Sequence, residues 1–104
     1  MINTKAKGSR FERSVKKKLE ELSCFVCKQA ASVFPDLIVA SPDRRMYFIE
    51  CKWNKYISKE ERQRFDELKK YGNCRIAYPK KCLHDKRKTE IVLCDLNYNN
   101  CEVL

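Results

Sequence analysis

The sequence predicts an α/β fold in which two helices flank a mixed sheet of five strands, in the order αβββαββ. Two segments repeat apolar residues at the 3.6-residue spacing of a helix, and five short runs are rich in β-branched and aromatic residues. The connections between these runs are short, as in an α/β sandwich. With 104 residues, two glycines and three prolines, we expect one domain spanning residues 1–104 without an internal linker.

The first helix is expected over residues 9–22, which read SRFERSVKKKLEEL. Its apolar residues fall on one stripe, formed by Phe11, Val15, Leu19 and Leu22. Ser9 followed three residues later by Glu12 is typical of a capping box, and this pattern predicts where the helix begins.

Three strands are expected next, at residues 24–30 (CFVCKQA), 36–40 (DLIVA) and 46–53 (MYFIECKW). The turn SPDRR and the other short connection favour an antiparallel meander. Side chains alternate along a strand, so the third strand should present Phe48, Glu50 and Lys52 on one face. The other face should hold Tyr47, Ile49, Cys51 and Trp53.

The second helix is expected over residues 58–72, with Phe65 and Leu68 on its apolar face. Ser58 and Glu61 match a second capping box, and Gly72 is the expected C-terminal cap. Strands at residues 74–79 and 89–96 complete the sheet, with a basic loop between them. The helix should form a right-handed crossover from the third strand to the fourth.

The chain is strongly basic, with a formal net charge of +9. Such an excess in a small domain indicates a nucleic acid as partner before an anionic membrane. The basic residues near the candidate site are Lys5, Lys7, Arg10, Arg13, Lys55, Lys59, Arg62 and Arg64. We interpret them as phosphate contacts, although each could also be ordinary helix surface.

The location is expected to be intracellular, in the cytoplasm or nucleoid, with no membrane association. No apolar run approaches the roughly 20 residues of a membrane span, and the first ten residues lack the apolar core of a secretory signal. Thiols normally stay reduced inside cells. An odd count of seven cysteines also argues against a complete disulfide framework.

The cysteines are interpreted as small apolar side chains rather than zinc ligands. Cys24 and Cys27 form a C-x-x-C, but a second pair is missing and His84 is the only histidine. One histidine and two glycines also disfavour a Ser-His-Asp triad and a glycine-rich phosphate loop. We expect no small-molecule cofactor.

Asp36, Glu50 and Lys52 interrupt two otherwise apolar runs. A meander brings the start of one strand beside the end of the next, which would gather these three residues. Two neighbouring carboxylates repel each other, and a divalent metal offsets this repulsion. Mg²⁺ takes one or two carboxylates together with water and substrate phosphate, and Mn²⁺ is the expected substitute.

The metal would activate a water, and the lysine would stabilise charge on the phosphate. The alternative is a surface ion pair between Glu50 and Lys52, with Asp36 as a turn residue after Pro35. The combination of PD, a gap of 13 residues and ECK favours a metal-dependent nuclease.

This pattern resembles the PD-(D/E)xK phosphodiesterase superfamily, whose fold many restriction endonucleases share, and within it the archaeal-type Holliday junction resolvases, cellular or viral. KGSRFERSVKKKLEEL is similar to that family's opening helix, where Glu12 matches an acidic metal-site residue. FVCKQAASVFPDLIVA is similar to the next segment, with Lys28 at a basic position, Ser32 at a serine position and Asp36 four residues beyond. YFIECKW supplies the acid and the lysine.

The resemblance covers roughly residues 7–79 and implies a restriction-endonuclease-like fold. It implies a metal site formed by Glu12, Asp36, Glu50 and the backbone carbonyl of Cys51. It implies that the catalytic residues are Glu12, Ser32, Asp36, Glu50 and Lys52. The DNA-binding residues that we assign are Lys7, Arg10, Arg13, Lys28, Lys55, Lys59 and Arg62. The chain departs from the family in having Lys28 where arginine is common, Ala31 where glycine is common, and a short segment after the fourth strand.

The function expected from these residues is structure-selective cleavage of branched DNA, most directly the resolution of Holliday junctions by paired phosphodiester hydrolysis. Two opposed cuts require a homodimer, and its interface is expected to use Tyr47, Trp53, Tyr56, Leu93 and Leu96. One alternative is a nuclease for flap, nicked or duplex DNA. Another is a DNA-binding module that has the fold without catalysis. The presence of all four residues Glu12, Asp36, Glu50 and Lys52 favours an enzyme.

Overall fold

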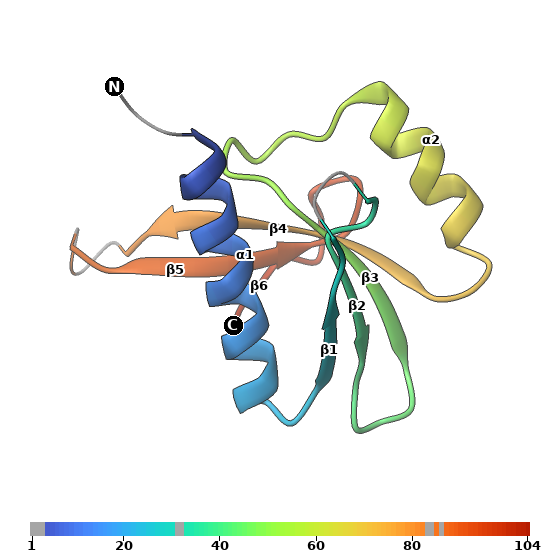
Figure 1. The fold of residues 1–104 in the computed structure, drawn as a ribbon, viewed down its shortest axis with the longest axis horizontal. Helices are drawn as coiled ribbons and strands as arrows, with labels where there is room; N and C mark the ends of the chain where they lie inside the picture. Colours follow the sequence, from blue (N-terminus) through green and yellow to red (C-terminus); the bar gives the residue numbers. More distant parts are fainter. Residues whose placement is uncertain (1–3, 31–32, 83–84, 86) are drawn as a thin grey trace.

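A computed structural model describes residues 4–30, 33–82, 85 and 87–104, with the side chains of the first helix described from Ser9 onward. Its elements are, in order, α1 (Thr4–Glu21), β1 (Phe25–Lys28), β2 (Leu37–Ala40), β3 (Met46–Cys51), α2 (Lys59–Leu68), β4 (Asn73–Lys81), β5 (Thr89–Cys94) and β6 (Glu102–Val103). The predicted order αβββαββ is confirmed as far as β5. The predicted count of five strands is wrong, because β6 is a sixth (Figure 1).

The strands form one mixed sheet in which each strand lies beside its neighbour in sequence, from β1 to β6. β1, β2 and β3 are antiparallel, as the predicted meander requires. β3 and β4 are parallel, because α2 carries the chain back between them. β4, β5 and β6 are again antiparallel. β3 therefore lies inside the sheet, and its C-terminal end is held from both sides.

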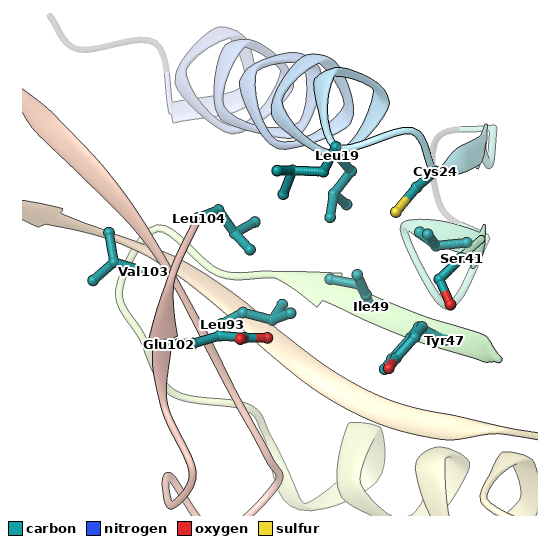
Figure 2. A pocket seen from close by; sticks show the side chains of 11 residues that line it. Leu19, Cys24, Ser41, Tyr47, Ile49, Leu93, Glu102, Val103 and Leu104 are labelled. Atoms are coloured by element: carbon teal, nitrogen blue, oxygen red, sulfur yellow. The ribbon is translucent and has the colours of Figure 1, made fainter. Parts of the chain in front are cut away.

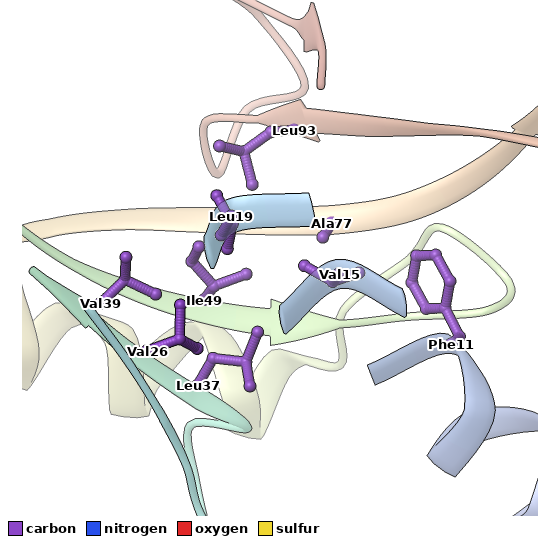
Figure 3. Packing of buried hydrophobic residues seen from close by; sticks show 9 residues of the cluster. All are labelled: Phe11, Val15, Leu19, Val26, Leu37, Val39, Ile49, Ala77 and Leu93. Atoms are coloured by element: carbon purple, nitrogen blue, oxygen red, sulfur yellow. The ribbon is translucent and has the colours of Figure 1, made fainter. Parts of the chain in front are cut away.

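α1 covers one face of the sheet. Phe11, Val15 and Leu19 are buried and point toward the sheet (Figure 3). The sheet residues of this cluster are Val26, Leu37, Val39, Ile49, Ala77 and Leu93. Tyr47 and Cys51 pack against the same cluster, so the predicted alternation of β3 is confirmed on this side. Leu22, predicted to end the stripe, is 50% exposed.

α2 covers the opposite face through Phe65, which is fully buried. Phe65 packs with Phe48 of β3 and Cys74 of β4, and the ring of Phe34 meets it edge-on at 4.7 Å. Alternation along β3 places Glu50 on this α2 side together with Phe48. Glu50 is 7% exposed and is the one buried charged residue among the described residues. A charge in that position requires compensating partners.

The start of α2 follows the predicted capping box. The backbone N–H of Ser58 donates to Oε1 of Glu61 at 2.8 Å, and the N–H of Glu61 donates to Oγ of Ser58 at 3.1 Å. The corresponding prediction for α1 is wrong, because α1 begins at Thr4 and Ser9 lies inside the helix. The lysines and alanine before Ser9 favour helix well enough for α1 to extend through Gly8.

Gly72 has a different role from the one predicted. α2 ends at Leu68 and its C-cap is Lys69, which has φ −62 in the right-handed region. A Cβ on Gly72 would lie 2.7 Å from the backbone oxygen of Met46. Glycine is therefore required here by the close approach of the β4 entrance to the first residue of β3.

The last segment of the chain is organised by a disulfide and an aspartate. The disulfide joins Cys94 to Cys101, a pair that the sequence did not predict. The carboxylate of Asp95 accepts hydrogen bonds from the backbone N–H groups of Asn97 and Asn99, both at 2.9 Å. Together they fold residues 95–101 into the turn that returns β6 to β5.

The five other cysteines are Cys24, Cys27, Cys51, Cys74 and Cys82, all free thiols. Cys74 is buried in the α2-side cluster, as expected for a small apolar residue.

Tyr98, within the turn closed by the disulfide, accepts a 3.1 Å hydrogen bond from the N–H of Ile57. This bond ties the loop between β3 and α2 to the end of the chain. Within the part of the chain that the structure describes, no helix has both the length and the apolarity needed to cross a membrane.

Candidate active site

Asp36 and Glu50 lie side by side where β2 begins and β3 ends. The pairing of Leu37 with Ile49 sets this register. The N–H of Asp36 donates to Oε1 of Glu50 at 3.0 Å, and the N–H of Cys51 donates to Oδ2 of Asp36 at 2.8 Å. One oxygen of each carboxylate is thus fixed by a backbone amide. The meander gathers the two acids as the sequence predicts.

Lys52 follows directly and brings its ammonium group to the same place. Its Nζ lies 4.0 Å from Oε2 of Glu50 and 2.6 Å from Oε2 of Glu61. The backbone N–H of Lys52 donates to the oxygen of Ala77 at 2.8 Å, which continues the parallel ladder beyond β3. The sequence predicts Glu61 only as part of a capping box, and its place in the site was not predicted. The short 52–58 connection was an available signal, because it keeps the first turn of α2 near the end of β3.

Glu12 and Lys28 reach the same edge from α1 and β1. Nζ of Lys28 lies 3.6 Å from Oε2 of Glu12, and Lys28 pairs with Leu37 in the sheet. The N–H of Gln29 donates to the backbone oxygen of Asp36 at 2.9 Å, which keeps the end of β1 against the site. The carboxylate of Asp36 is close enough to Glu12 to raise its pKa. Glu12 therefore lies at the same edge of the sheet as Lys28, and its assignment to the metal site stays a prediction.

The crowding of acidic groups alters their proton affinities. Burial, followed by the charge of Asp36, raises the pKa of Glu12 despite Lys28. Burial, a hydrogen bond with Glu61 and the charge of Asp36 raise the pKa of Glu50 to about 10. Burial alone would also raise the pKa of Glu61, but its hydrogen bonds with Glu50 and Lys52 lower that pKa to about 2. Within this acid pair, the pKa of Glu50 is therefore raised and that of Glu61 is lowered.

These residues fit a magnesium ion that also uses water and substrate oxygens. No three His, Cys, Asp or Glu side chains within the described ranges converge closely enough to hold a metal by themselves. The predicted set of Glu12, Asp36 and Glu50 is thus not a closed cage. Mg²⁺ usually takes only one or two carboxylates and fills its other positions with water and phosphate. A divalent cation would also favour ionised Glu50, and so offset the burial and the neighbouring acidic groups that raise its pKa.

The predicted DNA-binding residues differ in their surroundings. Arg10, Arg13 and Lys59 are exposed, and Arg62 is half-buried one residue after Glu61. Nζ of Lys55 instead lies 5.5 to 5.8 Å from the ring centroids of Tyr56, Tyr78 and Tyr98. Such contacts hold a cation by its attraction to the aromatic faces.

Two predicted site residues stay untested by this geometry. Ser32 and the side chain of Lys7 lie outside the described parts of the chain. Their assignment to catalysis and to DNA binding remains a prediction.

A separate apolar cavity of about 260 Å³ lies on the α1 side of the sheet (Figure 2). Leu19, Ser41 and Tyr47 line it, together with Leu104 at the end of the chain. Ser41 follows β2, whereas Asp36 precedes it, so the cavity and the carboxylates lie at opposite ends of that strand. The cavity is not part of the candidate active site.

Comparison with known proteins places the chain in a family. No curated protein and no solved structure matches the chain significantly. Residues 3–76 match the family described as archaeal Holliday junction resolvase (Hjc), which is more than half of the 104 residues. The matched stretch contains the whole acidic site, from Glu12 on α1 to Glu61 on α2. The chain therefore belongs to the archaeal Holliday junction resolvase family.

Proposed function

We propose that this protein is a magnesium-dependent endonuclease that resolves four-way DNA junctions by hydrolysing two phosphodiester bonds in opposed strands. The observation that carries the proposal is the pair of backbone-fixed carboxylates, Asp36 and Glu50, with the ammonium of Lys52 beside them. The family to which the chain belongs supports the junction as substrate. An enzyme acting on cellular or viral DNA works inside cells, so an intracellular location is part of this proposal.

Each residue of the site has a role in this chemistry. Asp36, Glu50 and the backbone carbonyl of Cys51 would hold Mg²⁺, with Glu12 approaching from α1. When bound, the ion supplies Lewis acidity and lowers the pKa of an attacking water. Lys52 would stabilise the negative charge that develops on the phosphate oxygens. The amide of Cys51 keeps the Asp36 carboxylate in one orientation throughout.

The basic surface would position the substrate without reading its sequence. Arg10 and Arg13 are exposed on the same helix as Glu12, and Lys59 and Arg62 flank Glu61. Contacts from such side chains to phosphates fix the duplex arms but carry no base information. This fits an enzyme that selects a branched structure.

A homodimer is the second part of the proposal, because opposed cuts require two active sites related by two-fold symmetry. The interface expected from sequence needs correction. Leu93 is a core residue, and Tyr47 and Leu96 pack against the core clusters. Trp53 and Tyr56 are 48% and 64% exposed and are retained.

The α2-side face of β1, β2 and β3 offers further apolar surface. Phe25 pairs with Ala40, and Ala40 pairs with Met46, so the three side chains form one row across the strands. Phe25 and Met46 are 75% and 42% exposed. We include this row in the proposed interface.

The test is cleavage of a synthetic four-way junction, compared with linear duplex and a flap substrate of equal length. We expect paired, symmetric nicks in the junction with Mg²⁺ or Mn²⁺, and no cutting after chelation of the metal. If the flap or the duplex is cut as fast as the junction or faster, the protein is better described as a flap or duplex nuclease. Tight binding without any cutting would favour the DNA-binding module.

A further inference from the structure

Glu61 makes two contacts at once from the first turn of α2. Its Oε1 accepts the 2.8 Å hydrogen bond from the N–H of Ser58, which fixes the carboxylate against the helix start. Its Oε2 lies 2.6 Å from Nζ of Lys52. The second carboxylate near Lys52, that of Glu50, is 4.0 Å away. Glu61 is therefore the principal anchor of the lysine among the two.

We propose that Glu61 is a positioning residue of the active site: locked by its capping box, it holds the ammonium of Lys52 beside Glu50. The inference rests on the proposed nuclease function, because it gives Lys52 a task that needs a fixed position. It adds a fourth carboxylate to the three that the resemblance assigns, with a different role from metal binding.

The need for an anchor follows from the chemistry of lysine. Its four-carbon side chain has many rotamers, so an ammonium without a close partner spends part of its time away from the site. The side chains of Lys52 and Glu61 are only 26% and 18% exposed. Water screens such a pair less than it screens a surface pair, so this ion pair is more effective than an exposed one.

The capping box also restricts the Glu61 side chain, so that its carboxylate does not move together with the Lys52 side chain. A glutamate on an open loop would add its own rotamers to those of Lys52. Here the carboxylate is tied to the N–H of Ser58, and the N–H of Glu61 is tied to Oγ of Ser58. The position of α2, set by Phe65 in the core, is thereby transmitted to Lys52.

Two variants separate the ion pair from the helix cap. Glu61→Gln keeps an oxygen for the N–H of Ser58, since capping boxes accept glutamine, but it removes the charge that faces Lys52. Ser58→Ala removes the Oγ that caps the N–H of Glu61, but it keeps the backbone N–H that fixes the Glu61 carboxylate opposite Lys52. A structural role alone predicts that Ser58→Ala is the more harmful change for both folding and activity.

We expect Glu61→Gln to lower kcat on junction DNA by about 10- to 100-fold, the usual effect of losing a residue that orients a group of the active site. KM for DNA and the Mg²⁺ concentration for half-maximal rate should not change, because Glu61 contacts neither DNA nor metal in this proposal. Ser58→Ala should lower the melting temperature by a few degrees and leave kcat near the wild-type value well below melting. An unchanged or raised kcat for Glu61→Gln would overturn the proposal, as would a higher Mg²⁺ requirement.

The positioning can also be measured without metal or DNA. Lysines of the metal-free protein are acylated briefly under limiting reagent and quantified by mass spectrometry, with exposed Lys59 as internal reference. Labelling of Lys52 relative to Lys59 should rise several-fold in Glu61→Gln and stay unchanged in Ser58→Ala. Equal labelling of Lys52 in the wild type and Glu61→Gln would refute the contact. Protected Lys52 in a wild-type protein that cuts no DNA would instead refute the proposed function while supporting the contact.

Discussion

The N–H of Asp36 donates a 3.0 Å hydrogen bond to Oε1 of Glu50, so the backbone of Asp36 is held by the side chain of Glu50. The bond crosses from the start of β2 to the end of β3, between strands paired in the sheet. Both carboxylates are therefore oriented by the sheet before any ligand binds. Such preorganisation lets a site stabilise charge without rearranging during the reaction.

Neutralising either carboxylate should abolish cleavage and preserve binding. Asp36→Asn and Glu50→Gln keep oxygen acceptors for the amides of Cys51 and Asp36, so the local fold is retained. We expect cleavage to fall by about 100-fold or more, with junction affinity equal or higher because negative charge near phosphate is removed. Gel-shift and cleavage assays on the same junction measure both. Wild-type cutting by either variant would show that the site is assigned wrongly.

The stability of the metal-free protein should fall as pH rises. The pKa of Glu50 is raised from 4.5 to about 10 in the fold, so between these values the folded protein keeps a proton that the unfolded chain releases. The slope is at most about 1.4 kcal/mol per pH unit for one proton. The lowered pKa of Glu61 acts in the opposite direction but only below pH 4.5. Denaturant unfolding from pH 5 to pH 9 measures the slope.

Glu50→Gln is the control for this pH dependence and should flatten the curve. Because Mg²⁺ needs ionised Glu50, the stabilisation that Mg²⁺ gives to the wild type should grow over the same pH range. A pH-independent effect of Mg²⁺ on unfolding would argue against Glu50 as a ligand.

Affinity for junction DNA should fall steeply with salt, with a log–log slope of about −0.9 for each phosphate neutralised. Arg10→Ala should make the slope shallower by about 0.9, since Arg10 is exposed near Glu12. Arg44→Ala is the matched control, because Arg44 is exposed in the β2–β3 turn, at the end of these strands away from Asp36. Titrations at four or more salt concentrations suffice. Identical slopes for the three proteins would remove Arg10 from the DNA surface.

Gly72→Ala should destabilise the fold by about 1 to 3 kcal/mol, as overpacking usually does. The added Cβ would lie 2.7 Å from the backbone oxygen of Met46, and neither backbone can yield without disturbing the β3–β4 pairing. Glu67→Ala, at an exposed position on α2, should change stability by less than about 0.5 kcal/mol. Urea unfolding of both variants provides the comparison. Equal stability of Gly72→Ala and the wild type would contradict the steric role.

The protein should sediment as a dimer at micromolar concentration, with an interface that buries on the order of 1,200 Å² or more in total. Phe25→Ser should shift it toward monomer, because Phe25 is the most exposed of the apolar side chains in the proposed interface. Arg44→Ala again serves as a surface control. A wild type that stays monomeric even on junction DNA would refute the resolvase proposal and favour a flap or duplex nuclease.

Local patterns were sufficient to predict the acidic pair. The alternation of β3 places Glu50 on the α2 side with Phe48, and the short turn after β2 fixes the register that brings Asp36 beside it. Both features depend on residues close in sequence. The capping box of Ser58 and Glu61 was predictable for the same reason.

Features that depend on tertiary contacts were not predictable in this way. The short 52–58 connection indicates only that α2 starts near the end of β3. The contact of Glu61 with Lys52 also requires the docking of α2 through Phe65, which no periodicity specifies. β6 has two residues, too few for a pattern, and the disulfide and the Asp95 turn hold it in place. Ser9 matched a helix start only in its spacing to Glu12, while the preceding residues extend the helix.

The hydrogen bond from the N–H of Lys52 to the oxygen of Ala77 has a consequence for how activity arises during synthesis. All the acidic residues of the site leave the ribosome before β4 does, yet the end of β3 has its parallel partner only after the chain has crossed over through α2. Contacts so distant in sequence form late, because a long loop must close first. A nascent chain that ends before β4 therefore carries the acids and the lysine without the parallel partner of β3, and nuclease activity should begin only after β4 has been made.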